Sequence, residues 1–168
     1  MTRLRDLRGR FVSNDPFDPR ALFDTSPAPV RIPLSWPNLS ALVDAEDYPL
    51  LNRVSWQAHT NDFGKQYAKT TMLIGGRKRA LYMHRIVACR VSLPPSREHT
   101  VVDHVNGDGL LNTRRNLRWA TPSENAINRN GGIVRQTDFL DRLAPLPPDD
   151  PDNPCTLVLR AISQLERG

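Results

Sequence analysis

The sequence has few cysteines and no long hydrophobic run. Its only two cysteines, Cys89 and Cys155, lie far apart and outside any CxxC pattern, which argues against a zinc knuckle and against a disulfide framework. We therefore expect reduced cysteines and a reducing, cytoplasmic compartment. No stretch of about 18 consecutive apolar residues occurs, as a membrane-spanning helix would require. The basic start MTRLRDLRGRF is not followed by the apolar segment of an export signal. These absences predict a soluble protein that is not exported.

Positive charge is concentrated in the middle of the chain. The 168 residues carry 23 Lys+Arg against 18 Asp+Glu, a formal net charge of +5. Residues 53–90 alone hold eight basic residues and one acidic residue, interleaved with Trp56, Tyr67 and Tyr82. Such a patch suits a polyanionic partner. Two interpretations of the patch stay open. One is contact with a phosphate backbone or groove, and the other is a solvated face above an ordinary aromatic core. The candidate DNA contacts here are Lys65, Lys69, Arg77, Lys78 and Arg79.

The chain divides into four parts. At 168 residues it is long enough for one compact domain with appendages. Residues 1–29 alternate Arg, Asp and Pro, which predicts a flexible basic and proline-rich arm. Residues 30–96 predict a small antiparallel sheet with a short helix, and residues 97–132 a separate strand and helix unit. Residues 133–168 predict a helical tail with a proline linker.

Short β-forming stretches separated by glycine-containing turns predict the sheet. Strands are expected at 30–34, 41–43, 54–58, 66–70 and 80–83. A short amphipathic helix is expected over 84–91, before the break at Pro94-Pro95. In the tail we expect helical turns at 138–143, an acidic proline linker at 145–154 and a final helix over 157–165.

The most informative stretch covers residues 99–132. Thr100-Val101-Val102 is strongly β-forming and ends in Asp103-His104, and residues 117–121 form a second short strand. Thr121-Pro122-Ser123-Glu124 is a capping box with proline at the first helical position. The helix that follows carries Asn125, Asn128 and Arg129 on one face, because they lie three and four residues apart. The predicted order is strand, loop, strand, helix.

These residues indicate a metal-assisted hydrolytic site. Packing of the helix against the two strands would bring Asn125 close to Asp103. A carboxylate and an amide carbonyl are hard oxygen donors, which suit Mg²⁺ or Mn²⁺ better than zinc. The neighbouring His104 is a candidate general base, since a neutral imidazole can take a proton from water near neutral pH.

The segment resembles the ββα-metal motif of HNH endonucleases of the homing and phage type. His104 matches the first motif residue, Asn116 the middle one, and Asn125 the third, which is His in some members and Asn in others. The resemblance covers residues 31–131, but only its catalytic third, with NLRWAT and PSENAINR, is highly specific. Where relatives commonly carry Leu-Asp-Asn-Arg in the loop, this chain has Leu110-Leu111-Asn112-Thr113-Arg114.

The resemblance implies an α+β fold in which a small antiparallel sheet precedes a ββα-metal (His-Me finger) nuclease unit, between flexible termini. It implies hydrolysis of DNA phosphodiesters with 5′-phosphate and 3′-hydroxyl products, in host cytoplasm if the gene is a phage gene. Asp103 and Asn125 would hold one Mg²⁺ or Mn²⁺, His104 would activate water, and Asn116 would fix the loop that orients His104. Double-stranded DNA is the expected partner, contacted also by Arg118, Asn128 and Arg129.

Other side chains receive more ordinary interpretations. His84 is expected to be a packed, hydrogen-bonded histidine, and Asn106, Asp108 and Asn112 are expected to be turn residues. Arg114 is a further candidate phosphate contact or a solvated side chain. Two alternative functions stay open: a DNA-binding protein whose nuclease unit is inactive, and an RNA-binding module that uses the basic sheet. The lack of an RRM-like aromatic signature disfavours the second alternative.

Overall fold

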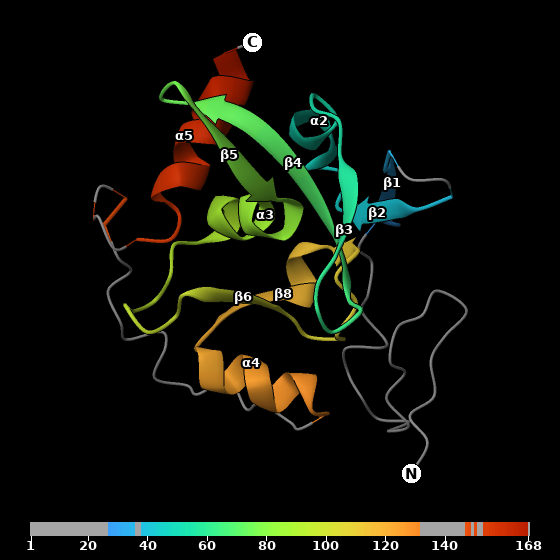
Figure 1. Ribbon diagram of the computed structural model, residues 1–168, viewed down its shortest axis with the longest axis vertical. Helices are drawn as coiled ribbons and strands as arrows, with labels where there is room; N and C mark the ends of the chain where they lie inside the picture. The colour runs from blue at the N-terminus through green and yellow to red at the C-terminus, as the bar shows by residue number, and fades with distance from the viewer. Residues whose placement is uncertain (1–26, 36–37, 132–146, 149, 151–152, 168) are drawn as a thin grey trace.

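Helix α3 (Met83–Val91) lies at the centre of the molecule, and its presence confirms the helix predicted over residues 84–91. In the computed structural model it passes between a sheet on one side and a pair of strands with a helix on the other (Figure 1). Met83, Ile86 and Val87 are fully buried, and α3 contacts strands of both layers. The structure describes residues 27–35, 38–131, 147–148, 150 and 153–167. Most of the predicted arm, the predicted turns at 138–143 and part of the linker lie outside these residues.

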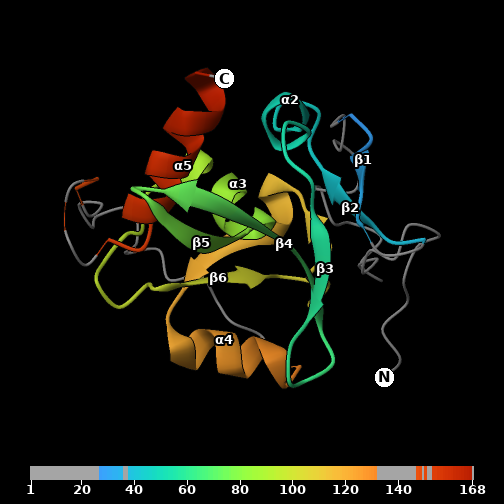
Figure 2. The ribbon, with the colours of Figure 1, turned by 45° about the horizontal axis from the view of Figure 1, so that its top comes forward.

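The sheet above α3 is antiparallel and three-stranded, in the order β3-β4-β5. Its strands are β3 (Gln57–Thr60), β4 (Gln66–Ile74) and β5 (Arg77–Tyr82). The predicted strands at 66–70 and 80–83 are thus confirmed and extended, up to a two-residue turn in which Gly75 and Gly76 have φ of 57° and 75°. Both residues of such a hairpin turn need positive φ, which glycine adopts freely. Figure 2 shows the long, twisted β4.

The prediction of one sheet over residues 30–96 is wrong. The strands β1 (Val30–Pro33) and β2 (Ser40–Val43) form a second sheet with β7 (Leu111–Asn112). β1 and β2 are antiparallel, but β2 and β7 are parallel, with Leu42 opposite Leu111. The short helix α2 (Tyr48–Leu51) turns the chain from β2 towards β3. A two-residue strand has no sequence pattern of its own, so this parallel pairing could not be predicted.

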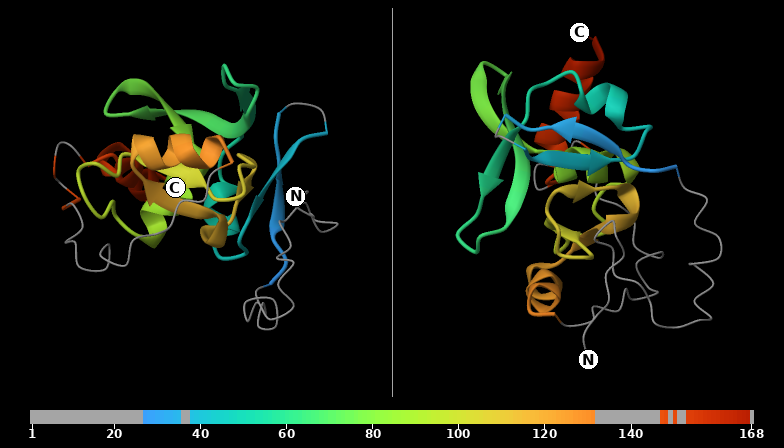
Figure 3. Two further views of the ribbon diagram at one scale, coloured as in Figure 1. Left: turned by 90° about the horizontal axis from the view of Figure 1, so that it is seen from below. Right: turned by 90° about the vertical axis from the view of Figure 1, so that its right-hand side faces the viewer.

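The predicted order of strand, loop, strand and helix is confirmed for residues 101–129. β6 (Val101–His104) pairs with β8 (Leu117–Ala120), and a 3₁₀ turn (Arg114–Asn116) precedes β8. Helix α4 (Pro122–Arg129) begins with the predicted capping box, in which Thr121 and Glu124 bond each other's backbone amides. Figure 3 shows α4 lying across the face of β6 and β8 that is turned away from α3.

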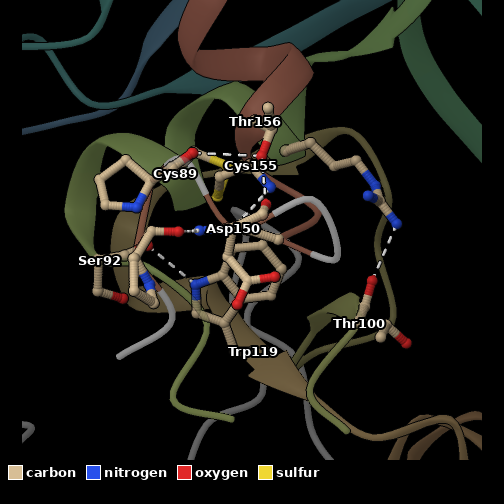
Figure 4. The surroundings of a disulfide bond; sticks show 11 residues. Cys89, Ser92, Thr100, Trp119, Asp150, Cys155 and Thr156 are labelled. Atoms are coloured by element: carbon tan, nitrogen blue, oxygen red, sulfur yellow. Dashed lines mark hydrogen bonds between the residues drawn. A yellow bond between two sulfur atoms is a disulfide. The ribbon is translucent and has the colours of Figure 1, made fainter. Parts of the chain in front are cut away.

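The last helix joins the core through a disulfide. Helix α5 (Thr156–Arg167) buries Val158, Ala161, Ile162 and Leu165, the spacing of one helix face. Cys155, at its start, is bonded to Cys89 of α3, with a Cα–Cα distance of 5.8 Å (Figure 4). The expectation of unpaired cysteines is therefore wrong, and the expectation of a reducing compartment loses its support. Their distance in sequence concealed the pairing, because helix packing brings them together.

Among the described residues, no helix has the length and apolar character that crossing a membrane requires.

The disulfide should contribute strongly to stability. It joins residues 66 apart in sequence. In the chain-entropy model, closing a loop of that size raises the free energy of the unfolded chain by about 4 kcal/mol. We expect the Cys89→Ala/Cys155→Ala variant to lose about that free energy of unfolding in urea. Wild-type protein unfolded with a reductant is the control and should behave like the variant. Equal stability of the oxidised wild type and the variant would contradict this prediction.

Candidate active site

A cavity of about 280 Å³ lies between the β3-β4-β5 sheet and the β6–β8–α4 unit. One wall comes from the sheet and the start of α3, and the opposite wall from β6, the following loop and α4. The cavity brings together Asp103, His104 and Asn125, which the sequence analysis selected as metal ligands and base. The lining residues from the sheet side include His59, Lys65, Tyr67, Tyr82, His84 and Arg85.

Asp103 is a buried carboxylate, 4% exposed, with a donor at each oxygen. Arg118, its partner in the β6–β8 register, donates from Nε and Nη2 to Oδ2 over 3.0 and 2.6 Å. Asn128 Nδ2 donates to Oδ1 over 2.9 Å and also to the carbonyl oxygen of His104 over 3.0 Å. The predicted DNA contacts Arg118 and Asn128 thus hold Asp103 in this structure. Asn125, one turn earlier on α4, borders the cavity beside Asp103.

His104 is oriented by Asn112, which sequence reasoning took for a turn residue. Asn112 is fully buried, and its Nδ2 donates to the carbonyl oxygen of Leu110 over 3.2 Å. Its Oδ1 lies 3.1 Å from His104 Nε2. Because Oδ1 can only accept, Nε2 carries the proton and Nδ1 keeps the lone pair that can take a proton. Nothing in the sequence distinguishes Asn112 from the other loop asparagines, since its role depends on the β2–β7 pairing.

The buried position of His104 favours its neutral form. Burial lowers its pKa below the ordinary histidine value. The hydrogen bond to Asn112 and the charge of Asp103 oppose that shift, whereas the charge of Lys65 adds to it. The neutral imidazole is the form that a general base requires.

Asn116 holds the loop between β6 and β8. Its Oδ1 accepts from the amide of Asn106 over 3.0 Å, and its Nδ2 donates to the carbonyl oxygen of Leu111 over 2.8 Å. Its own carbonyl oxygen accepts from the amide of Val105, directly after His104. Asn116 is buried and lies behind the loop instead of bordering the cavity.

A second buried histidine shares the cavity with His104. His84, 8% exposed, packs edge to face against the His104 ring with the ring centroids 5.0 Å apart. The expectation of a hydrogen-bonded His84 is not met at Nδ1, which is buried without a partner among the described residues. Burial, with the neighbouring His104 and Arg85, lowers the pKa of His84 well below its ordinary value. His84 is therefore an uncharged ring at neutral pH.

The predicted basic surface is divided between two faces of the sheet. Directly opposed residues in antiparallel strands point to the same side. Lys69 is opposite Tyr82 and Lys78 is opposite Leu73, so both lysines lie on the face of Tyr67 and Tyr82. Arg77 and Arg79 oppose Ile74 and Met72 and point to the other face. Lys65 borders the cavity, and the guanidinium of Arg129 lies 4.6 Å from the ring centroid of Phe63.

An acidic cluster outside the cavity binds the side chain of Arg114. Asp44, Glu46 and Asp47 are the one group of three acidic, His or Cys side chains close enough for a shared ion within the described ranges. Arg114 donates to Asp47 over 2.8 and 3.0 Å and pairs with Glu46, and these contacts raise its pKa. Arg114, a candidate phosphate contact by sequence, thus ties the loop before β8 to α2.

Comparisons of the chain with protein-family models, with curated protein sequences and with solved structures find no significant match.

Gly109 should be essential for the fit between the loop and the sheet. A Cβ at this position would lie 2.3 Å from the carbonyl oxygen of Gln66 and 2.8 Å from the Tyr67 ring. We expect Gly109→Ala to lower the free energy of unfolding by about 1–3 kcal/mol through overpacking and to shift the NMR resonances of the His104 ring.

Gly75→Ala is the matched control for Gly109→Ala. A Cβ at Gly75 meets no atom within 4 Å, although its φ of +57° also disfavours alanine. The control should therefore lose stability without moving the His104 resonances. Unchanged His104 resonances in Gly109→Ala would contradict the proposed close contact.

The two neutral histidines should make the protein sensitive to acid. Both have a lower pKa in the folded protein than in the unfolded chain, so the unfolded chain binds more protons below pH about 6.5. The free energy of unfolding should fall as the pH drops from about 6.5 to 5.5, by up to about 1.4 kcal/mol per unit for each histidine. His84→Gln should reduce this slope in urea unfolding measured across that range. A flat profile in the wild type would disprove the prediction.

Proposed function

We propose that the protein is a metal-dependent DNA endonuclease of the HNH type, with β6, β8 and α4 as its ββα-metal unit. The proposal rests on one observation, which is that Asp103, His104 and Asn125 line the same cavity. Asn112 fixes the tautomer of His104 there. The resemblance of the motif supports the same assignment. The β3-β4-β5 sheet would then contact DNA with Lys69 and Lys78, and Lys65 would approach the phosphate at the cavity.

The donor set fits a small divalent cation. The carboxylate of Asp103 and the side-chain oxygen of Asn125 are hard ligands of the kind that Mg²⁺ and Mn²⁺ prefer. Each oxygen of Asp103 has two lone pairs. Oδ2 accepts two hydrogen bonds from Arg118, and Oδ1 accepts one from Asn128, so a lone pair of Oδ1 remains for an ion. When bound, the ion would offset negative charge on the phosphate and the leaving oxygen.

The protein side chains would divide the remaining work. His104 would accept a proton from the attacking water at Nδ1, and Asn112 would hold the Nε2 proton on the opposite side of the ring. Asn116 would keep the loop after His104 in place through its bonds to Asn106 and Leu111. Arg118 would hold Asp103 in position. The neutral state of His104, which burial favours, would let it act as a base at and somewhat below neutral pH.

Nicking of supercoiled plasmid in magnesium tests the proposal. His104→Ala, which removes the general base, and Asp103→Ala, which removes a metal ligand, should each reduce the nicking rate at least about 100-fold, while DNA binding measured by fluorescence anisotropy changes little. EDTA should abolish nicking by the wild type. The time course also separates nicking from double-strand cleavage.

His99→Ala is the control for loss of a buried histidine. His99 is 5% exposed and bonds Ser96 over 2.8 Å, but it lies outside the cavity, so the variant should nick like the wild type. Full nicking by His104→Ala or by Asp103→Ala would overturn the assignment. Tight DNA binding without nicking by the wild type would favour an inactive DNA-binding protein instead.

A further inference from the structure

The sheet wall of the cavity is built from aromatic rings. His59, opposite Tyr67 in the register, lies on the same face as Tyr67 and Tyr82. The centroids of Tyr67 and Tyr82 are 6.2 Å apart, and each ring lies 5.5 Å from His84. Rings of a hydrophobic core are covered, whereas these border an open cavity and only His84 is buried. Parts of the Tyr67 and Tyr82 rings are therefore available to a ligand, whereas the His84 ring is largely covered.

The two walls carry different groups, and besides its aromatic rings the sheet wall has the cations Lys65 and Arg85. Burial and the nearby Asp103 raise the pKa of Tyr67, and burial lowers that of His84, so both rings are neutral. The opposite wall carries Asp103, His104 and Asn125, and Lys65 of the sheet side lies near His104. A phosphate group suits the side of Lys65, where a positive charge is present. The neutral rings suit a flat, uncharged heterocycle such as a nucleobase, because each of the four bases can stack on an aromatic side chain.

We propose that this cavity takes up a single DNA nucleotide that has left the base stack, with its base against Tyr67, Tyr82 and His84 and its phosphate beside His104. This inference rests on the proposed nuclease function and specifies the form of its substrate. The cavity, of about 280 Å³ and open to solvent, can receive the base of one unstacked nucleotide.

Unstacking has an energetic cost that stacking on protein rings can offset. The cost is lowest where a base is already unpaired, so the protein should prefer DNA with an unpaired nucleotide.

Binding to three DNA duplexes tests the inference without requiring cleavage. All three have random-sequence arms, and they carry at the centre an unpaired adenine, an abasic site at the same unpaired position, or a normal base pair. Affinities of the wild-type protein are measured by fluorescence anisotropy in EDTA. The duplex with unpaired adenine should bind at least about fivefold more tightly than the abasic duplex, as stacking of one base implies. The abasic duplex controls for flexibility of the backbone.

Ring variants locate the contact. Tyr67→Leu should reduce the ratio of the two affinities to about one, and Tyr67→Phe, which keeps the ring, should preserve it. Phe63→Leu is the matched control, because Phe63 is 69% exposed and lies outside the cavity. If Tyr67→Leu fails to fold by circular dichroism, Tyr82→Leu provides the same test.

Equal affinity for the adenine and abasic duplexes would overturn the inference, and so would a ratio that survives both Tyr67→Leu and Tyr82→Leu. If the wild type nicks DNA but binds the adenine and abasic duplexes equally, the base-binding inference is wrong and the nuclease proposal stands. A base preference that depends on the tyrosines, in a protein that never nicks, would support the cavity as a base-binding site and overturn the nuclease proposal alone.

Discussion

The buried side chain of Asn112 is the constraint on which the site depends. Its 0% exposure requires that its polar atoms find partners, because an unsatisfied buried amide is costly. Nδ2 donates a hydrogen bond to the carbonyl oxygen of Leu110, so Oδ1 faces His104. This orientation in turn fixes which nitrogen of His104 holds a proton. The chemistry of the cavity therefore depends on a hydrogen bond in the core.

The pairing of β7 with β2 places Asn112 there. Val43 is opposite Asn112 in this parallel pair, and Val43 itself is fully buried. The β1-β2-β7 sheet thus supports the loop of the β6–β8–α4 unit, in addition to covering the core. Gly109 provides a second attachment, because its lack of a side chain lets the loop lie against the backbone of β4. The loop is therefore held from two sheets.

Sequence reasoning succeeded where the signal is local. The capping box at Thr121 and Glu124 was found because its residues are three apart, and α4 begins there. The grouping of Asp103, His104 and Asn125 was found because one short unit carries all three. It failed where partners are distant: the Cys89–Cys155 bond, the β2–β7 pair and the entry of His84 into the cavity all depend on how elements pack. The proline break after α3 suggested a boundary, but α3 is shared by both sides.

The charge balance at Asp103 links the two proposals. A carboxylate that is 4% exposed needs compensation, and Arg118 supplies it from the adjacent strand. A cation bound at Asp103 and Asn125 would therefore join a carboxylate whose charge is already balanced, and the additional positive charge would favour an anion nearby. The phosphate of a nucleotide is such an anion. Because the facing rings of Tyr67 and His84 are neutral, they offer the phosphate no competing charge and leave their surfaces to the base. In the proposed complex, Lys65 near His104 would place the phosphate at that end of the cavity, and the neutral rings would contact the base.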